Sequence, residues 1–351
     1  GLELHIVFNK GAVMVLPASV NKATGLAAAL EALGLSARNV AAIGDAENDH
    51  ALLHMAEYSV AVANAVPTLR DNADRVSVHD HADAVIELIA NLIEHDLRGT
   101  PPRRIRRHIL LGELDSGEPV HMAPAGTNLL IAGTSGSGKS TLATGVLERL
   151  CEQGYQFCVV DPEGDYQEFS AGVVFGNADR APSVDEVLSA LEKPQTNAIV
   201  NLVGLSLQDR PRFFLDLLPR LQSLRAKTGH PHWVLVDETH HLMPKDWEPT
   251  PLILPREMAG MIYVTVHPDW MAAPVLQTAD LVAALGEAPR ETLEAVAASV
   301  GAEPPKSAPE LEPGQALLWR AAGGTPALRF RVAQSRSERR RHRRKYAEGE
   351  L

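Results

Sequence analysis

The chain has 351 residues and a formal charge of −11 at pH 7. Its 45% hydrophobic and 22% charged residues are ordinary for a globular protein, which excludes a disordered or collagen-like chain. No apolar run approaches the ~18 residues that a membrane-spanning helix needs, and the length favours two domains. The two cysteines, Cys151 and Cys158, are too few for a disulfide framework. We therefore expect reduced thiols and a cytoplasmic protein.

Positive charge is concentrated in two strips of an otherwise acidic chain. Residues 98–108 hold five arginines and no acid, and residues 335–345 hold seven basic residues and one acid, which leaves −22 on the remainder. Such strips are either a solvated linker and tail or phosphate contacts with a nucleic acid. Because a Pro-Pro pair interrupts the first strip, we place a boundary there. The expected parts are a first domain at 1–97, a linker at 98–108, a second domain at 109–333 and a tail at 334–351.

The first domain alternates helices with short apolar strands. Apolar spacing predicts a helix over 22–33 that ends at Gly34, and the first amino acids show no secretory leader. Short strands and further helices follow, at 40–43, 51–56, 58–62 and 83–94. Such alternation is typical of an α/β fold with a parallel sheet.

A cluster of polar residues follows the strand at 40–43. Asp45 and Asp49 lie four residues apart after Gly44, at the strand end where α/β sheets bind ligands. Their carboxylates suit Mg²⁺, and Lys22 would neutralise a phosphoryl group. The alternative reading is an ordinary Asp-rich turn.

The segment Val20-Asn21-Lys22, followed by Gly44-Asp45-Ala46-Glu47-Asn48-Asp49, resembles the haloacid dehalogenase (HAD) superfamily, and among its members the Cof-type phosphatases. The resemblance covers about residues 10–95. It implies that Lys22 stabilises phosphate, that Asp45 and Asp49 belong to a Mg²⁺ site, and that Asn48 supports it. The family's D-x-D-G-T nucleophile motif is absent from the sequence. We therefore expect the C-terminal half of such a unit, either cut from a longer protein or decayed into a structural module, with phosphatase activity only if a longer protein supplies that motif upstream.

The second domain opens on a phosphate-binding motif. An apolar strand at 128–132 leads into G-T-S-G-S-G-K-S-T and then into a helix, the context that confirms a P-loop. We expect the loop to bind the phosphates of a nucleotide, Lys139 to reach the β- and γ-phosphates, and the Ser140 hydroxyl to ligate Mg²⁺. The expected nucleotide-binding residues are Gly133, Thr134, Ser135, Gly136, Ser137, Gly138, Lys139, Ser140 and Thr141.

A pair of acids follows a second apolar strand at 232–236. Asp237 is expected to hold the Mg²⁺, and Glu238 is expected to act as general base on the attacking water. Strands at 157–161 and 261–266 are the remaining elements of the sheet. The second of them runs into His267, either a γ-phosphate sensor or an ordinary capped strand end.

These segments, together with D-P-E-G-D-Y and D-E-T-H-H-L-M-P, resemble the HerA/FtsK-like branch of P-loop ATPases over about residues 108–333. The resemblance implies ATP hydrolysis, often in a ring of subunits and often acting on DNA. His267 stands where such enzymes usually have an amide side chain. Arg256 and Arg290 are candidates for an arginine finger, although a solvated loop is the alternative for each.

The expected fold class is therefore α/β with two Rossmann-like parallel-sheet domains. The expected function is Mg²⁺-dependent ATP hydrolysis, with a homo-oligomeric ring and a nucleic acid bound by the basic strips as candidate partners. Two alternatives stay open: a P-loop kinase fused to a HAD phosphatase, and a nucleotide-gated regulator without catalysis. A start without Met and an abrupt charged end also favour a fragment of a longer protein.

Overall fold

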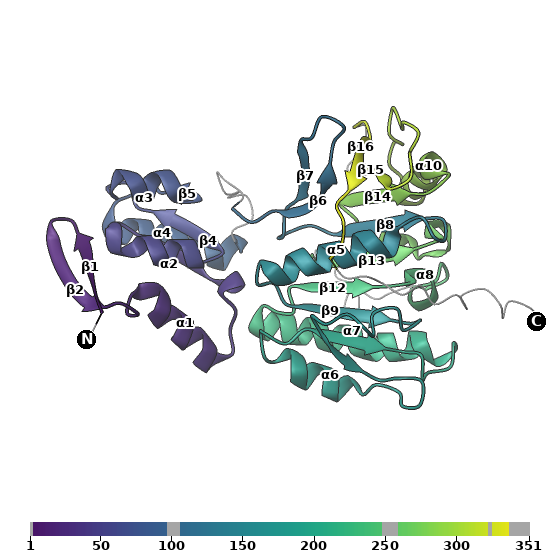
Figure 1. Ribbon diagram of the computed structural model, residues 1–351, viewed down its shortest axis with the longest axis horizontal. Coiled ribbons are helices and arrows are strands. Elements are labelled where there is room, and N and C mark those ends of the chain that lie inside the picture. The colour runs from purple at the N-terminus through teal and green to yellow at the C-terminus, as the bar shows by residue number, and fades with distance from the viewer. Residues whose placement is uncertain (1–2, 97–105, 248–258, 322–324, 337–351) are drawn as a thin grey trace, which may run out of the picture. The chain divides into compact units, whose positions relative to one another are not determined.

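The computed structural model describes residues 3–96, 106–247, 259–321 and 325–336. The chain divides into two compact units, Gly1–Arg106 and Arg107–Leu351. In Figure 1 the first unit runs from purple to blue and the second from blue-teal to yellow. The linker expected at 98–108 and the tail expected at 334–351 lie mostly outside the described residues.

The first unit is built on a small parallel sheet in the order β3–β4–β5. Its strands are β3 (Ala41–Gly44), β4 (Tyr58–Ala61) and β5 (Arg75–Val76). Its helical segments are α1 (Lys22–Leu33), η1 (Ala37–Asn39), η2 (Glu47–Asp49), α2 (His50–Met55), α3 (Pro67–Asn72) and α4 (His81–His95). Their apolar side chains, among them Leu53 and Leu69, form its main core.

A hairpin that the sequence analysis did not predict precedes α1. Strands β1 (Leu4–Asn9) and β2 (Ala12–Pro17) pair antiparallel across a two-residue turn at Lys10 and Gly11. Both turn residues have positive φ angles, as a two-residue hairpin loop requires. One face of the hairpin carries five exposed apolar side chains, namely Leu4, Ile6, Phe8, Val13 and Val15.

The second unit contains a mixed sheet of 11 strands among its described residues. Seven neighbouring strands are parallel, in the order β10–β11–β9–β12–β13–β8–β14. They are β8 (Leu129–Gly133), β9 (Phe157–Asp161), β10 (Val173–Phe175), β11 (Ala198–Asn201), β12 (Trp233–Val236), β13 (Met261–Thr265) and β14 (Leu281–Leu285). All but β10 are buried along their whole length, as expected of parallel strands covered on both faces.

Four antiparallel strands extend this sheet beyond β14, in the order β15–β16–β6–β7. They are β15 (Gln315–Arg320), β16 (Leu328–Val332), β6 (Ile109–Glu113) and β7 (Pro119–Met122). The sheet is thus parallel-rich, as predicted, and longer than a Rossmann-like sheet alone.

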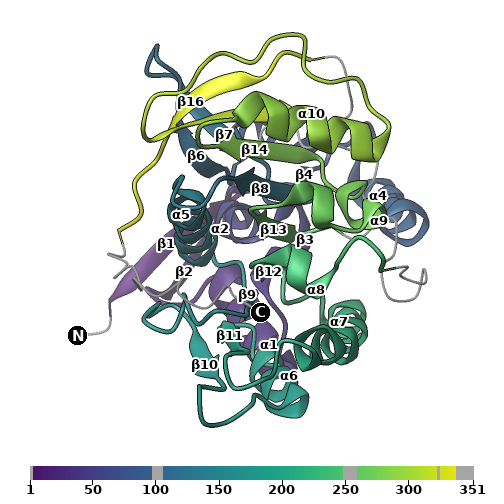
Figure 2. The same cartoon turned by 90° about the vertical axis from the view of Figure 1, so that its right-hand side faces the viewer.

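Helices cover both faces of the sheet. They are α5 (Lys139–Glu152), α6 (Val184–Leu191), α7 (Asp209–Thr228), α8 (Thr239–Leu242), η3 (Pro268–Trp270), α9 (Ala273–Leu276) and α10 (Pro289–Val300). Side chains of α5 join one core cluster, and those of α6, α7, α9 and α10 join the other. Figure 2 shows α5 on one side of the strands and α7, α8 and α9 on the other.

The predicted elements agree closely with the observed ones. The helix at 22–33 has the predicted bounds, because the Asn21 side chain accepts the Thr24 N–H at its start and Gly34 adopts the left-handed conformation at its end. The strand at 157–161 also has the predicted bounds, and the other predicted helices and strands differ by one or two residues at one or both ends. Cys151 and Cys158 are free thiols, as expected. Within the described ranges, no helix combines the length and the apolar character of a membrane span.

Candidate functional site

The predicted P-loop lies between β8 and α5. Gly138 caps the helix with a φ angle of 101°, in the left-handed region that favours glycine. Helix α5 begins at Lys139, so the backbone N–H groups of its first turn have no partner within the helix. Together with the helix dipole, these groups form an anion-binding site. Ser140 and Thr141 follow in that first turn.

Lys139 is held across the loop in this geometry. Its ammonium donates to the carbonyl oxygens of Gly133 and Thr134, each at 2.9 Å, and the residue is only 7% exposed. A lysine side chain folded over its own loop is positioned to transfer these bonds to phosphate oxygens. The Ser137 hydroxyl oxygen is also buried, without a hydrogen-bond partner among the described residues.

The predicted acids lie at the end of β12. Asp237 is 3% exposed, and its Oδ1 accepts the backbone N–H of Glu238 at 3.0 Å. Glu238 has a φ angle of 41°, a strained conformation for a residue with a side chain. Strand β13 separates β12 from β8, so the acids stand two strand spacings, ~9.5 Å, from the P-loop strand.

A group of rings surrounds Glu238. His240 in α8 is buried, and its Nδ1 lies 3.0 Å from Thr265 Oγ1 and 3.6 Å from Glu238 Oε2. His267 follows β13; its backbone N–H donates to Thr265 Oγ1 at 3.0 Å, and its ring stacks on Trp270 with centroids 4.0 Å apart. The sequence analysis singled out His267 but missed His240 and Thr265, although His240 belongs to the quoted D-E-T-H segment.

The His240 ring is neutral under ordinary conditions. Burial lowers its pKa to about 3, and the nearby positive charges of His241, His267 and Lys139 act in the same direction. A neutral imidazole carries one N–H and one acceptor nitrogen, so His240 can donate only one hydrogen bond at a time.

The acidic turn after β9 is organised around Asp161. This fully buried carboxylate accepts the backbone N–H groups of Gly164, Asp165 and Tyr166. Burial raises its pKa to about 6, outweighing those hydrogen bonds. The D-P-E-G-D-Y segment is therefore a turn that is held by hydrogen bonds to the buried Asp161 carboxylate.

The first unit brings together the polar residues predicted there. Lys22 Nζ donates to Asp49 Oδ1, and the backbone N–H groups of Asp45 and Ala46 donate to Asp49 Oδ2 at 2.9 and 3.2 Å. Burial alone would raise the pKa of Asp49; the Lys22 ammonium and the two N–H groups outweigh it and lower the pKa.

Lys10, in the hairpin turn, is a member of this cluster that the sequence analysis missed. Its ammonium pairs with Asp45 Oδ2 at 2.7 Å. Each predicted metal-binding carboxylate thus already has a lysine partner. Asn48 Oδ1 is buried without a hydrogen-bond partner, yet no group of three acids, histidines or cysteines suited to a metal occurs in the described part of the chain. Asp45 and Asp49 as Mg²⁺ ligands stay a prediction, and in this geometry each of the two carboxylates is paired with a lysine.

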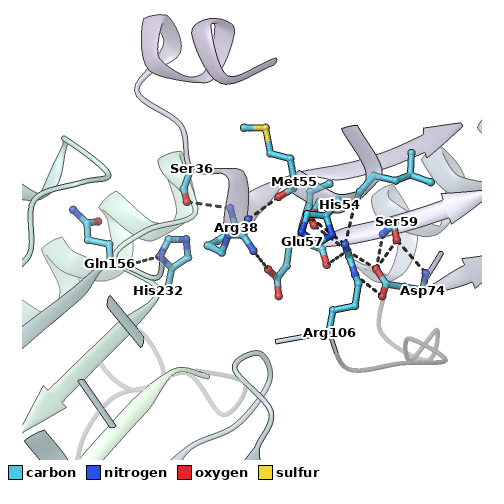
Figure 3. Close-up of polar contacts among 12 residues, drawn as sticks. Ser36, Arg38, His54, Met55, Glu57, Ser59, Asp74, Arg106, Gln156 and His232 are labelled. Carbon is cyan, nitrogen blue, oxygen red and sulfur yellow. Dashed lines mark hydrogen bonds and ion pairs between the residues drawn. The ribbon is translucent and has the colours of Figure 1, made fainter. Parts of the chain in front are cut away.

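The remaining candidates are arginines. Arg256 lies outside the described residues, and Arg290 donates to Glu294 one helical turn away. Arg106, from the basic strip, donates to both oxygens of Asp74 and to backbone carbonyls that include Ala56 (Figure 3). It is therefore engaged within the first unit and is not available to a nucleic-acid phosphate.

Comparisons with protein families identify the two halves separately. Residues 5–89 match the model of haloacid dehalogenase-like hydrolases, and residues 113–218 match the model of the central domain of helicase HerA.

Curated relatives match the first segment. Phosphoglycolate phosphatase 2 of Saccharolobus solfataricus is 35% identical over 89 residues, and phosphoglycolate phosphatase of Methanothermobacter thermautotrophicus is 42% identical over 84 residues. These matches cover 25% and 24% of this chain. The chain spans only 38% of the length of each relative, which is less than the half unit expected from the motifs.

Solved structures resemble the larger part of the chain. VirB4 of Thermoanaerobacter pseudethanolicus is 14% identical, with a TM-score of 0.47, over 66% of this chain and 98% of that one. The genome packaging NTPase B204 of Sulfolobus turreted icosahedral virus 2, in complex with ATP-gammaS, is 18% identical, with a TM-score of 0.44, over 60% and 99%. The chain, on its two family matches, joins a HAD-like segment to a HerA-like P-loop ATPase segment.

Proposed function

We propose that the second unit binds ATP with Mg²⁺ and hydrolyses it. The observation that carries this proposal is the placement of the buried Asp237 and the adjacent, half-buried Glu238 two strands from the P-loop strand. That placement gives an acid access to a water molecule beyond the γ-phosphate. The match to the HerA central domain supports the same conclusion.

Each predicted residue takes one role in this proposal. Lys139 and the N–H groups of residues 133–141 bind the phosphates, and Glu238 accepts a proton from the attacking water. The Ser140 hydroxyl and the Asp237 carboxylate supply the oxygen ligands that Mg²⁺ prefers, which fits that cation. When bound, Mg²⁺ neutralises charge on the phosphates. In this proposal His267 is the γ-phosphate sensor.

The two alternative functions, kinase and regulator, require different features of the site. A kinase needs an acceptor hydroxyl near Glu238 in place of water, and a regulator needs ATP binding without turnover. Glu238 lies directly after Asp237 at a buried strand end, which favours water as the nucleophile.

The wider setting is also a proposal. We propose a cytoplasmic ATPase that acts in a homo-oligomer, and on nucleic acid through the basic residues of 98–108 and 334–351 other than Arg106. For the first unit we propose binding of a phosphorylated ligand by Lys22, with phosphoryl transfer only where a longer protein supplies the D-x-D-G-T motif that the given sequence does not contain. Phosphate release from phosphoglycolate by the purified chain would contradict this last point.

The deciding experiment is steady-state ATP hydrolysis by the chain, with and without duplex DNA, beside Lys139→Ala and Glu238→Gln. We expect both substitutions to abolish turnover, and Glu238→Gln to keep ATP binding. Stimulation by DNA would support the nucleic-acid partner, and indifference to DNA would remove it. ATP binding without hydrolysis by the unsubstituted chain would favour the regulator, whereas phosphate transfer to a hydroxyl acceptor would favour the kinase.

A further inference from the structure

Glu238 presents its two carboxylate oxygens differently. Oε2 is buried, and it is the oxygen that lies 3.6 Å from His240 Nδ1. A general base needs one carboxylate oxygen directed at the water. The other oxygen must be held in place so that the carboxylate has the same orientation in every turnover. We take Oε2 as the oxygen that is held, because it is the carboxylate oxygen that lies beside the His240 ring.

His240 is surrounded by groups that fix its ring. Its side chain is 4% exposed, Thr265 Oγ1 lies 3.0 Å from Nδ1, and the His241 and His267 rings lie 4.1 and 5.5 Å away by centroid. Trp270 closes the group with an edge-on contact at 6.1 Å. A ring packed on several sides keeps its Nδ1 at one place, next to two oxygen acceptors.

In the tautomer with the hydrogen on Nδ1, that hydrogen has two acceptors within reach. Thr265 Oγ1 already accepts the His267 N–H, and a hydroxyl oxygen has a second lone pair for Nδ1–H. The 3.6 Å separation from Glu238 Oε2 is only slightly longer than a hydrogen bond. A carboxylate movement of less than about 1 Å would bring Oε2 within bonding distance of Nδ1.

We propose that His240 is a positioning residue for Glu238: with its hydrogen on Nδ1, the ring bonds Thr265 Oγ1 in this structure and donates that hydrogen to Glu238 Oε2 when the base engages water. This inference rests on the proposed hydrolysis and adds to it a hydrogen bond that sets the orientation of the Glu238 carboxylate. His240 touches neither water nor phosphate in this role; it acts only through Glu238. Thr265 acts as the alternative acceptor that keeps the hydrogen in place between turnovers.

Substitutions at residue 240 distinguish a role of His240 as hydrogen-bond donor through Nδ1 from a role of its ring in packing alone. The amide nitrogen of His240→Asn stands close to the Nδ1 position, that of His240→Gln reaches toward the Nε2 position, and His240→Phe keeps a ring without a donor. We expect His240→Phe to lower kcat about 10- to 100-fold with an ATP Kd within twofold of the original. His240→Asn should recover most of that loss and His240→Gln little of it.

The test is single-turnover ATP hydrolysis, with ATP binding measured alongside, in the full chain. Tryptophan fluorescence melts verify folding, and His121→Phe, on β7 at the far edge of the sheet, serves as a matched control. The decisive comparison repeats His240→Phe in a Glu238→Gln background and follows the slow single-turnover rate that remains when steady-state turnover is no longer detectable; the inference predicts no further loss there, because no base remains to be positioned. An equal loss in both backgrounds, full activity of His240→Phe, or equal rates for His240→Asn and His240→Gln would each overturn it. If Glu238→Gln alone keeps the original rate, the proposed function fails, and the inference fails with it.

Discussion

The guanidinium of Arg106 bonds both carboxylate oxygens of Asp74, Nε to Oδ1 at 2.8 Å and Nη2 to Oδ2 at 2.6 Å. Asp74 is 2% exposed, and it also accepts the backbone N–H and the hydroxyl of Ser59 (Figure 3). The same guanidinium donates to backbone carbonyls at the end of α2, including those of Leu53 and Ala56. One arginine thus joins the α2 terminus to the β4 strand of the first unit.

Substituting Arg106 with methionine should unfold the first unit more readily. Removing one partner of a buried ion pair leaves the other charge uncompensated, at a cost of about 3–5 kcal/mol. Arg106→Lys should recover only part of this, because lysine lacks the planar fork that bonds both oxygens. Hydrogen exchange at the Ser59 amide reports on this unit, because all four tryptophans lie in the second.

The control for Arg106 is an exposed pair of the same types. Arg220 bonds Asp185 with side chains 43% and 79% exposed, so Arg220→Met should change stability by less than about 1 kcal/mol. Unchanged exchange at Ser59 in Arg106→Met would show that the pair in Figure 3 contributes nothing to the fold.

Gly286, directly after β14, should be necessary for the P-loop to keep its shape. Its φ angle is 97°, and a Cβ at this position would lie 2.3 Å from Thr134 Oγ1 and 3.0 Å from Ser137 Cβ. Gly286→Ala should therefore displace the loop and weaken ATP binding at least tenfold. Isothermal titration calorimetry with a non-hydrolysable ATP analogue measures the effect.

A substitution at a second glycine distinguishes the effect of the steric clash from the effect of backbone strain. Gly314 has a φ angle of 81°, and a Cβ at this position would meet nothing within 4 Å, so Gly314→Ala introduces strain without displacing a neighbour. It should lower stability while leaving the ATP Kd unchanged. Equal losses of affinity in both variants would mean that the steric contact with Thr134 is unimportant.

The exposed face of the β1–β2 hairpin should promote self-association. Ile6 and Phe8 are each 57% exposed and neighbour one another on one face. Replacing both with threonine keeps strand propensity and reduces the exposed apolar surface, so light scattering at high concentration should fall without loss of folding. Unchanged scattering would show that this face does not drive association of the chain.

Local signals explain what the sequence could predict. The helix at 22–33 was bounded correctly because its cap residues, Asn21 and Gly34, act within a few residues of the helix. The P-loop and the strands beside it were recognisable for the same reason. The roles assigned to Lys139, Asp237 and Glu238 stay predictions, although the geometry is compatible with them.

Long-range contacts explain what the sequence could not predict. Strand β16 pairs with β6 across more than 200 residues, and neither strand has a strong pattern of its own. Lys10 meets Asp45 only through a hairpin whose Lys-Gly turn lacks the usual Asn-Gly signal. Likewise, His240 and Thr265 are 25 residues apart and meet only when β12 and β13 pair.

Two buried groups should make the stability of the second unit respond to pH in opposite directions. The pKa of His240 falls from 6.5 to about 3 on folding, so between these values only the unfolded chain binds the proton, and stability falls as the pH is lowered. The pKa of Asp161 rises from 3.8 to about 6, so the folded chain binds the proton there, and stability rises as the pH is lowered.

Between about pH 4 and pH 6 the two responses should nearly cancel, and single substitutions should reveal each one. Asp161→Asn leaves the histidine response, so stability should fall with decreasing pH by up to about 1.4 kcal/mol per pH unit. His240→Asn leaves the opposite slope. Urea unfolding followed by tryptophan fluorescence at several pH values measures both slopes. The slopes are compared, and not the absolute stabilities, because Asp161→Asn also removes the carboxylate that accepts the N–H groups of Gly164 and Tyr166, which weakens the turn at every pH. Parallel pH profiles for the two variants would contradict the burial of these charges.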